Sequence, residues 1–330
     1  MNAITLAVRA LLIGLLVASF SFAADSKPQS DGSELIARAA LAQGIRQPSG
    51  KPFFLHMRIH AQGAVSKPMD GVYQELWISP DKWRREIAFP GFQQLEVGDV
   101  GSKWVSRNLE FRPGAAYLTA FALNVLETIS VLSDETIKSL SQKNNKGGNL
   151  QCAELVFKNG APSRTICFDA SGAVASLEWQ NRRFEYRDYG KFGDKVFPRS
   201  IRVFEDGFKV LDMAADDLAA PPAYKPDVFQ HDGSARQMAP CERWPTTPSG
   251  KVPPHYPSDA RASRQQGAVT LYVLVSPDGR VEQADVLESA AASLDRAAAE
   301  AVRQWTYPPV SCGTAPLETE IEVSVNFTLR

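Results

Sequence analysis

The sequence contains few histidines and cysteines and has almost no net charge. Each of the two residue types occurs four times among 330 residues, and 36 basic side chains nearly cancel 37 acidic ones. Nucleic-acid binding proteins carry a strongly basic surface, so this charge balance gives no reason to expect nucleic acid as a partner. Hydrophobic residues at 44% and charged residues at 22% exclude a disordered chain. The length predicts two folded domains.

The sequence also lacks the motifs of common catalytic and metal sites. It contains no GxSxG elbow, no HExxH and no CxxC, and its glycine pair at 147–148 has no strand-to-helix context for phosphate binding. His56 and His60 fall on one face of a strand-like run, but no third metal ligand is placed beside them. We therefore predict a protein that is not an enzyme and holds no metal and no cofactor.

The N-terminus has the pattern of an export signal. Arg9 precedes an apolar run at residues 10–18, and Ser21-Phe22-Ala23 fits a small-x-small cleavage site. We predict that residues 1–23 are a signal peptide and are removed. The alternative is an uncleaved membrane anchor formed by residues 4–24. Because no cysteine lies near the cleavage site, a lipid-modified N-terminus is excluded.

The four cysteines are expected to be oxidised after export. Cys152 and Cys167 lie on either side of a turn-rich stretch at residues 158–163, so a hairpin would place them opposite each other. Four cysteines allow three pairings, and this one leaves Cys241 and Cys312 for each other. We predict both disulfides.

The first domain is predicted to be rich in antiparallel strands. Short apolar or aromatic runs separated by turn residues fill residues 52–108 and 150–216. A short helix is expected from Ser33, a plausible N-cap, to Gly44, a plausible stop. These runs predict one curved sheet.

A helical insert is predicted within this sheet, at residues 115–140. Leu118, Phe121 and Val125 recur there at helical spacing, and a second short helix is predicted to begin at Ser133. Because amphipathic helices need a surface to cover, we expect the insert to lie on the sheet.

A proline-rich segment separates the two domains. Residues 219–257 contain nine prolines, which predicts an extended tether. Beyond it, strands are predicted at 268–276, 281–289 and 317–329, with a helix at 293–305. The fold class is thus α+β: an antiparallel half-barrel with a helical lid, joined by a Pro-rich tether to a small ββαβ domain. The predicted boundaries are 1–23 for the signal, 24–222 for the first domain, 223–250 for the linker and 251–330 for the last domain.

The last domain resembles the TonB C-terminal domain family, to which energy transducers belong. The resemblance rests on several features in one order, in residues 252–329. These are Tyr256-Pro257, Ala260-Arg261, Gly267, Pro277-Asp278-Gly279-Arg280-Val281, Leu294-Asp295, Ala298, Ala301, Trp305, Tyr307, Pro309 and Asn326-Phe327. Gly279 is expected to adopt a positive φ in a tight turn.

This resemblance implies that the final strand lies at the edge of its sheet. There it would pair with an extended segment of an outer-membrane receptor or another envelope protein. The predicted partner-binding residues are Leu317, Thr319, Ile321, Val323, Val325 and Phe327. Alternation along the strand predicts Glu318, Glu320 and Glu322 on the solvent face.

Two departures from that family bear on function. Energy transducers of the family keep an N-terminal membrane helix with a histidine that couples to a proton-driven motor complex, and a long Pro-rich spacer follows it. Residues 1–24 here contain no histidine. We therefore favour a periplasmic docking module, with an inner-membrane energy transducer as the alternative.

The first domain more loosely resembles the LolA-like fold of periplasmic lipoprotein carriers. The matching runs are 71–84, 97–104, 189–192 and 197–199. The resemblance implies an apolar concave face that shelters a lipid, an acyl chain or a hydrophobic protein segment. The predicted cavity residues are Trp77, Phe89, Phe92, Trp104, Leu118, Phe121 and Val125. A homodimer formed by swapping of the tail stays open as a further alternative.

Overall fold

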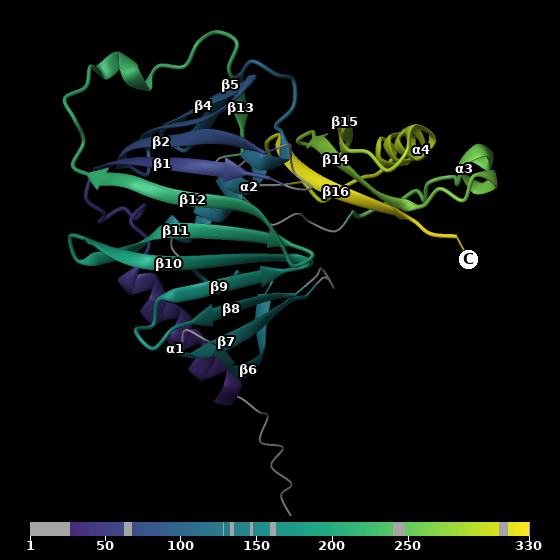
Figure 1. Ribbon diagram of the computed structural model, residues 1–330. Helices are drawn as coiled ribbons and strands as arrows, with labels where there is room; N and C mark the ends of the chain where they lie inside the picture. Colours follow the sequence, from purple (N-terminus) through teal and green to yellow (C-terminus); the bar gives the residue numbers. More distant parts are fainter. Residues whose placement is uncertain are drawn as a thin grey trace, which may run out of the picture.

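The computed structural model describes residues 27–62, 68–127, 129–132, 135–145, 148–158, 163–239, 248–309 and 316–329. The described residues form one very large antiparallel sheet and one small sheet (Figure 1). This α+β architecture agrees with the predicted class. The predicted signal peptide lies outside the described residues.

The larger sheet has thirteen strands and is not closed into a barrel. Its order is β13-β5-β4-β3-β2-β1-β12-β11-β10-β9-β8-β7-β6, so it is a meander except where β1 pairs with β12 and where β13 pairs with β5. The strands are β1 (Phe53–Ala61), β2 (Met69–Ser79), β3 (Lys82–Phe89), β4 (Phe92–Asp99), β5 (Ser102–Arg107), β6 (Glu135–Asn145), β7 (Gly148–Phe157), β8 (Arg164–Phe168), β9 (Val174–Trp179), β10 (Arg182–Phe192), β11 (Lys195–Glu205), β12 (Phe208–Ala219) and β13 (Arg236–Met238).

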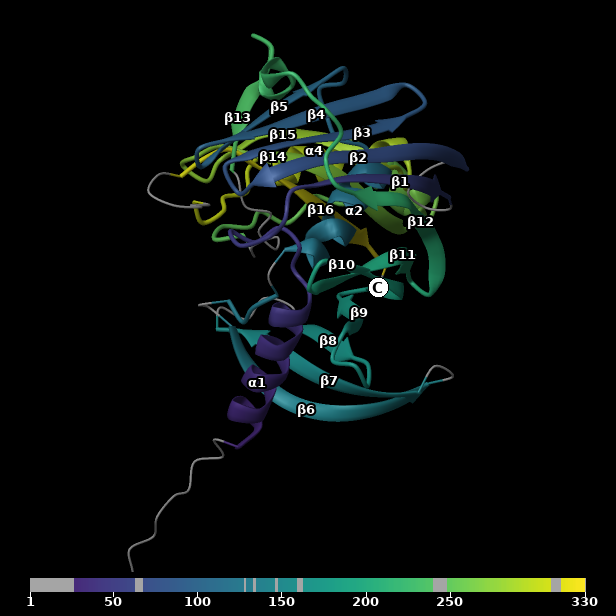
Figure 2. The ribbon, with the colours of Figure 1, turned by 90° about the vertical axis from the view of Figure 1, so that its left-hand side faces the viewer.

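Two helices lie on the concave face of this sheet, as Figure 2 shows. α1 (Lys27–Ala42) packs near β6 and β11, and α2 (Gly114–Ala122) with the short 3₁₀ helix η2 (Leu123–Leu126) packs near β3, β11 and β12. Gly44 follows α1 with a φ of 72°, which supports its predicted role as the stop. The helices bury the apolar side chains of the concave face, so the core lies between lid and sheet.

The helix predicted to begin at Ser133 is wrong, because residues 135–145 form the edge strand β6. Ile137 there is buried and its side chain lies against Gly32 of α1, while the backbone of β6 pairs with β7 along its length. The segment thus forms a strand because its backbone pairs with β7, although the spacing of its apolar residues is typical of a helix.

Part of the predicted tether packs on the larger sheet. The 3₁₀ helix η3 (Pro226–Phe229) accepts a 3.0 Å hydrogen bond at the Val228 carbonyl from Arg84, and β13 pairs with β5. The two described parts of the linker, 223–239 and 248–250, flank a stretch outside the described residues.

The C-terminal domain is a three-stranded sheet, order β15-β14-β16, covered on one face by a helix. Its elements are α3 (Ser258–Ala262), β14 (Gly267–Val275), β15 (Val281–Glu288), α4 (Ala292–Val302) and β16 (Thr319–Phe327). This is the predicted ββαβ order. Gly279 has a φ of 86° in the β14–β15 turn, as predicted.

Candidate functional site

The strand β16 lies at the edge of the small sheet. It pairs with β14 from Thr319 to Phe327, and no other described strand pairs with its outer edge. The amide of Ala239 donates to the carbonyl of Glu318 just before the strand begins. Since that carbonyl points away from β14, the backbone groups of Ser324 and Asn326, an even number of residues further on, also point outward.

The side chains of the predicted partner-binding residues point into the C-terminal domain. Ile321, Val325 and Phe327 are at most 5% exposed and pack in one core with α4, and Val323 packs against that core. Leu317 and Thr319 are half-buried at the start of the strand. The edge therefore offers its backbone rather than these side chains.

The prediction that Glu320 and Glu322 face solvent is wrong. Their side chains are 8% and 7% exposed because the N-terminal domain covers this face of β16. Glu320 forms ion pairs with Arg107 and Arg112, and it accepts a 2.6 Å hydrogen bond from the hydroxyl of Tyr272. Burial opposes ionisation, but the two guanidinium groups hold the pKa of Glu320 below its usual value.

A second group of charges surrounds Arg182 at the start of β10. Its guanidinium binds Glu322 of β16 and donates a 2.8 Å hydrogen bond to Glu205 of β11. Burial raises the pKa of Glu322 above its usual value, and the nearby Glu205 acts in the same direction against Arg182. Glu288 of β15 lies close by, with its pKa raised to about 7 by burial and by the carboxylates of Glu205 and Glu322.

Apolar side chains complete the contact between the two domains. Tyr272 and Leu274 of β14, on the sheet face opposite α4, pack with Val105 and Met238 in one buried cluster. Phe111 lies against Tyr272, with the ring centroids 6.5 Å apart. A cavity of about 530 Å³ lies beside this cluster, between the domains. The small sheet is thus covered on both faces.

The structure brings six of the seven predicted cavity residues into one core. Trp77, Phe89, Phe92, Leu118, Phe121 and Val125 are all at most 7% exposed. The ring of Phe121 stands 5.0 Å from that of Phe184 and 5.9 Å from that of Trp179, measured between centroids. The concave face around these residues is therefore filled by the protein's own lid.

Trp104 lies apart from the other six. On β5 its neighbours Lys103 and Val105 are buried, so Trp104 points to the opposite face, where it stacks on His231 of the linker at 4.1 Å. Phe89, at the end of β3, also borders an open groove of about 700 Å³ with Val72 and Pro90.

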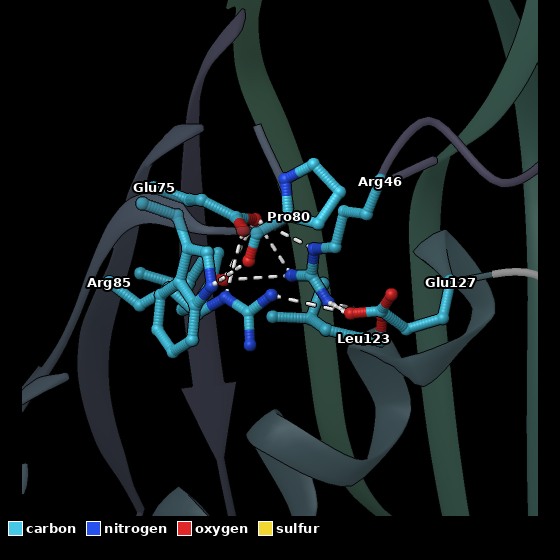
Figure 3. A network of polar contacts seen from close by, with 8 residues as sticks. Arg46, Glu75, Pro80, Arg85, Leu123 and Glu127 are labelled. Carbon is cyan, nitrogen blue, oxygen red and sulfur yellow. Dashed lines mark hydrogen bonds and ion pairs between the residues drawn. The ribbon is translucent and has the colours of Figure 1, made fainter. Parts of the chain in front are cut away.

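A buried ion network fastens the lid to the sheet (Figure 3). Arg46, which follows α1, binds the carboxylate of Glu75 on β2 at 2.7 Å and the carbonyl of Leu123 at 3.2 Å. Arg85 of β3 donates to the second oxygen of Glu75 at 2.8 Å. Burial opposes the charge of Glu75, but Arg46 and Arg85 hold its pKa below the usual value. No sequence pattern marked this network.

Of the two predicted disulfides, Cys152–Cys167 is present and joins facing residues of β7 and β8. Cys241 and Cys312 lie outside the described residues. In the described part of the chain, no three histidine, cysteine or acidic side chains gather as metal ligands, and no helix is long and apolar enough to cross a bilayer. His56 and His60 instead contact Asp216 and Asp70.

Comparison with known proteins supports the resemblance predicted for the last domain. Residues 252–329 match the family model of the Gram-negative bacterial TonB protein C-terminal domain. This segment is TonB-like. The chain is 37% identical to Protein TonB of Klebsiella pneumoniae over 91 residues, which are 26% of this chain and 35% of that protein. The chain therefore spans about a third of the length of the TonB that it matches.

The N-terminal domain has similar solved structures at low sequence identity. One is a putative outer membrane lipoprotein-sorting protein domain from Vibrio parahaemolyticus, 14% identical, with a TM-score of 0.42 over 62% of this chain and 96% of that one. Another is a LolA superfamily protein from Nitrosomonas europaea, 10% identical, with a TM-score of 0.41 over 62% of this chain and 98% of that one.

Proposed function

We propose that this protein is a periplasmic envelope adaptor whose TonB-like domain docks on a partner by strand addition. The observation that carries the proposal is the open outer edge of β16 in a domain that matches the TonB family model. An edge strand binds an extended segment through main-chain hydrogen bonds, and this needs no free side chains. The proposed activity is binding and not catalysis.

The partner we propose is an outer-membrane receptor or another envelope protein. A photo-crosslinking amino acid placed at Asn326, which is exposed and next to the outer edge, should give an adduct with such a protein in the native envelope. The same amino acid at Glu300, exposed on α4, is the control position.

The variant Ser324→Pro tests the role of the edge itself. The amide of Ser324 points away from β14, so proline there leaves the ladder of the folded sheet intact and removes one outward donor. We expect the adduct at Asn326 to disappear in this variant while its melting temperature stays close to the wild type. An adduct that persists in full would contradict strand addition.

We propose that the protein is released into the periplasm by cleavage after Ala23. Similarity to TonB favours a second candidate, an inner-membrane energy transducer that keeps residues 4–24 as its anchor. Sequencing the N-terminus of the protein from native cells separates the two. A chain that begins at Ala24 or Asp25 supports the adaptor, and one that begins at Met1 supports the anchored transducer.

A lipid or acyl chain is the ligand we propose for the N-terminal half-barrel, and it would have to displace α2. The side chains of Leu118 and Phe121 occupy the space over the sheet, and each is at most 7% exposed. Native mass spectrometry of the full chain, after incubation with a fluorescent fatty acid, should show a bound acid. Its absence in the wild type and in Phe121→Ala, which opens a cavity, would exclude a carrier role.

A further inference from the structure

The open edge of β16 faces one rim of the larger sheet. This rim consists of Arg182 at the start of β10 and residues 205–208 of the β11–β12 hairpin. In both views of the fold, β15, β14 and β16 follow one another toward the ends of β10 and β11 (Figures 1 and 2). The ion pair from Arg182 to Glu322 joins this rim to β16 directly. An added strand would lie about 4.8 Å from β16. It would therefore run beside the rim.

An exposed aromatic side chain stands on this rim. Phe208 opens β12 directly after the hairpin turn at Asp206-Gly207, and it is 76% exposed. It pairs across the hairpin with Glu205, so both side chains lie on the same face, toward the C-terminal domain. Aromatic side chains are the usual anchors of protein interfaces.

The rim also carries an excess of negative charge. Glu205 and Asp206 are two carboxylates at the β11–β12 turn, and Arg182 binds Glu205 and Glu322. Glu288 and Glu322 of the C-terminal domain lie close to this turn. The nearby cations are engaged on the outer face of the sheet, where Arg183 stacks on the ring of Phe204 and Lys209 binds Asp212. Burial is the main cause of the raised pKa of Glu288, and the carboxylates of Glu205 and Glu322 raise it further.

Resting on strand addition at β16, we propose that Asp206 and Phe208 form the second wall of the docking site. This wall selects an extended protein segment that carries a lysine or arginine two positions from an apolar residue. Side chains two apart on a strand share one face, so both would point at the rim while the backbone pairs with β16. The N-terminal domain thereby supplies the specificity that a backbone edge lacks.

Two synthetic peptides test this in the ¹⁵N-labelled full chain. One is acetyl-TVTKTFTV-amide, and in the other glutamate replaces the lysine. We expect the lysine peptide to shift the amide signals of residues 324–327 and to bind about tenfold more tightly than the glutamate peptide, a factor that corresponds to about 1.4 kcal/mol.

Two variants locate the selectivity. Phe208→Ser should weaken the lysine peptide about fivefold, and Asp206→Asn should reduce the preference for lysine over glutamate. Asparagine suits position 206, where φ is 49°. The control is Leu41→Ser on α1, because Leu41 is 72% exposed and lies away from the site. It should leave both affinities unchanged.

The outcomes separate this inference from the proposed function. Equal binding of the two peptides, unchanged by Phe208→Ser and Asp206→Asn, would overturn the second wall and leave strand addition standing. If neither peptide shifts any amide of β16, both proposals fail. A tenfold preference that disappears in Asp206→Asn supports the rim as the selective element.

Discussion

Arg182 links the two domains through a single guanidinium group. It touches Glu205 within its own domain and Glu322 across the interface, and all three side chains are at most 11% exposed. A buried ion pair adds little net stability over an apolar contact, but removing one partner leaves an uncompensated buried charge. Loss of Arg182 would leave two such charges.

Replacing Arg182 with Met is therefore expected to lower the free energy of unfolding by about 3 kcal/mol, measured by urea denaturation. The matched control is Arg183→Met, since the neighbouring Arg183 is 45% exposed and pairs with Glu185 at the surface. Its cost should stay below about 1 kcal/mol. An equal loss in both variants would show that Arg182 is not a buried partner.

Glu288 predicts a pH dependence of stability. Its pKa is raised from 4.5 to about 7, so the folded protein keeps a proton that the unfolded chain releases. The stability from this proton is complete below about pH 4.5 and is lost as pH rises through 7. The lowered pKa of Glu320 acts below that window, where falling pH removes stability.

Between pH 5 and 7.5 we therefore expect the melting temperature to fall as pH rises, and to fall less in Glu288→Gln. Thermal unfolding followed by circular dichroism gives both slopes. Glu300→Gln, on the exposed face of α4, is the control and should keep the wild-type slope. Matching slopes in the wild type and Glu288→Gln would refute the assignment.

At the scale of elements, turn residues made most strands predictable. Within the predicted strand-rich region 52–108, Pro90-Gly91 separates two apolar runs, and β3 and β4 end and begin on either side of it. The interface between domains was missed, although β14 carried a signal of it. Its nine residues are apolar on both faces apart from Thr270, which is typical of a strand covered on both sides.

The arginines of the interface could not be found from sequence. Arg107 and Arg182 lie 213 and 140 residues from their glutamate partners, and neither belongs to a local motif. Alternation along β16 correctly separated Ile321 from Glu322, but it could not show that a second domain covers the glutamate face. Only the docking of two folded domains determines that burial.

The β14–β15 turn offers a test of local backbone geometry. An added Cβ at Gly279, where φ is 86°, would stand 2.0 Å from the carbonyl oxygen of Tyr307. We expect Gly279→Ala to destabilise the protein by about 3 kcal/mol, from strain at positive φ and from the clash. Gly172 has a φ of 84°, and a Cβ added there would meet no atom within 4 Å. Gly172→Ala therefore measures the strain at positive φ without a clash, and we expect it to cost about 1 kcal/mol. Equal losses would mean that the clash relaxes freely.

At the scale of the molecule, the contact between domains should be separable from the fold of each. Leu274 is buried between the domains, on the face of β14 opposite α4. Leu274→Asp places an unpaired charge there, and its cost is relieved when the domains part. We expect small-angle X-ray scattering to give a radius of gyration larger by more than about a tenth, with circular dichroism unchanged.

Val286→Asp is the control for that measurement, because Val286 lies on β15 and its side chain is 36% exposed. It should leave the radius of gyration at the wild-type value. An unchanged radius in Leu274→Asp as well would mean that the charged contacts alone hold the domains together.

Once the ion pairs and apolar contacts between the domains are broken, tension on the C-terminal domain would reach the larger sheet through β13. This strand holds β5 by three residue pairs, and the bond from Ala239 to Glu318 follows it directly. So short a strand peels off before its longer neighbours. Residues 220–239 would then form an extended segment with a length on the order of 70 Å, at 3.3–3.6 Å per residue. β13 would therefore separate from β5 before any longer strand is pulled. The C-terminal domain and a partner bound to it would move by up to that distance before force acts on the rest of the larger sheet.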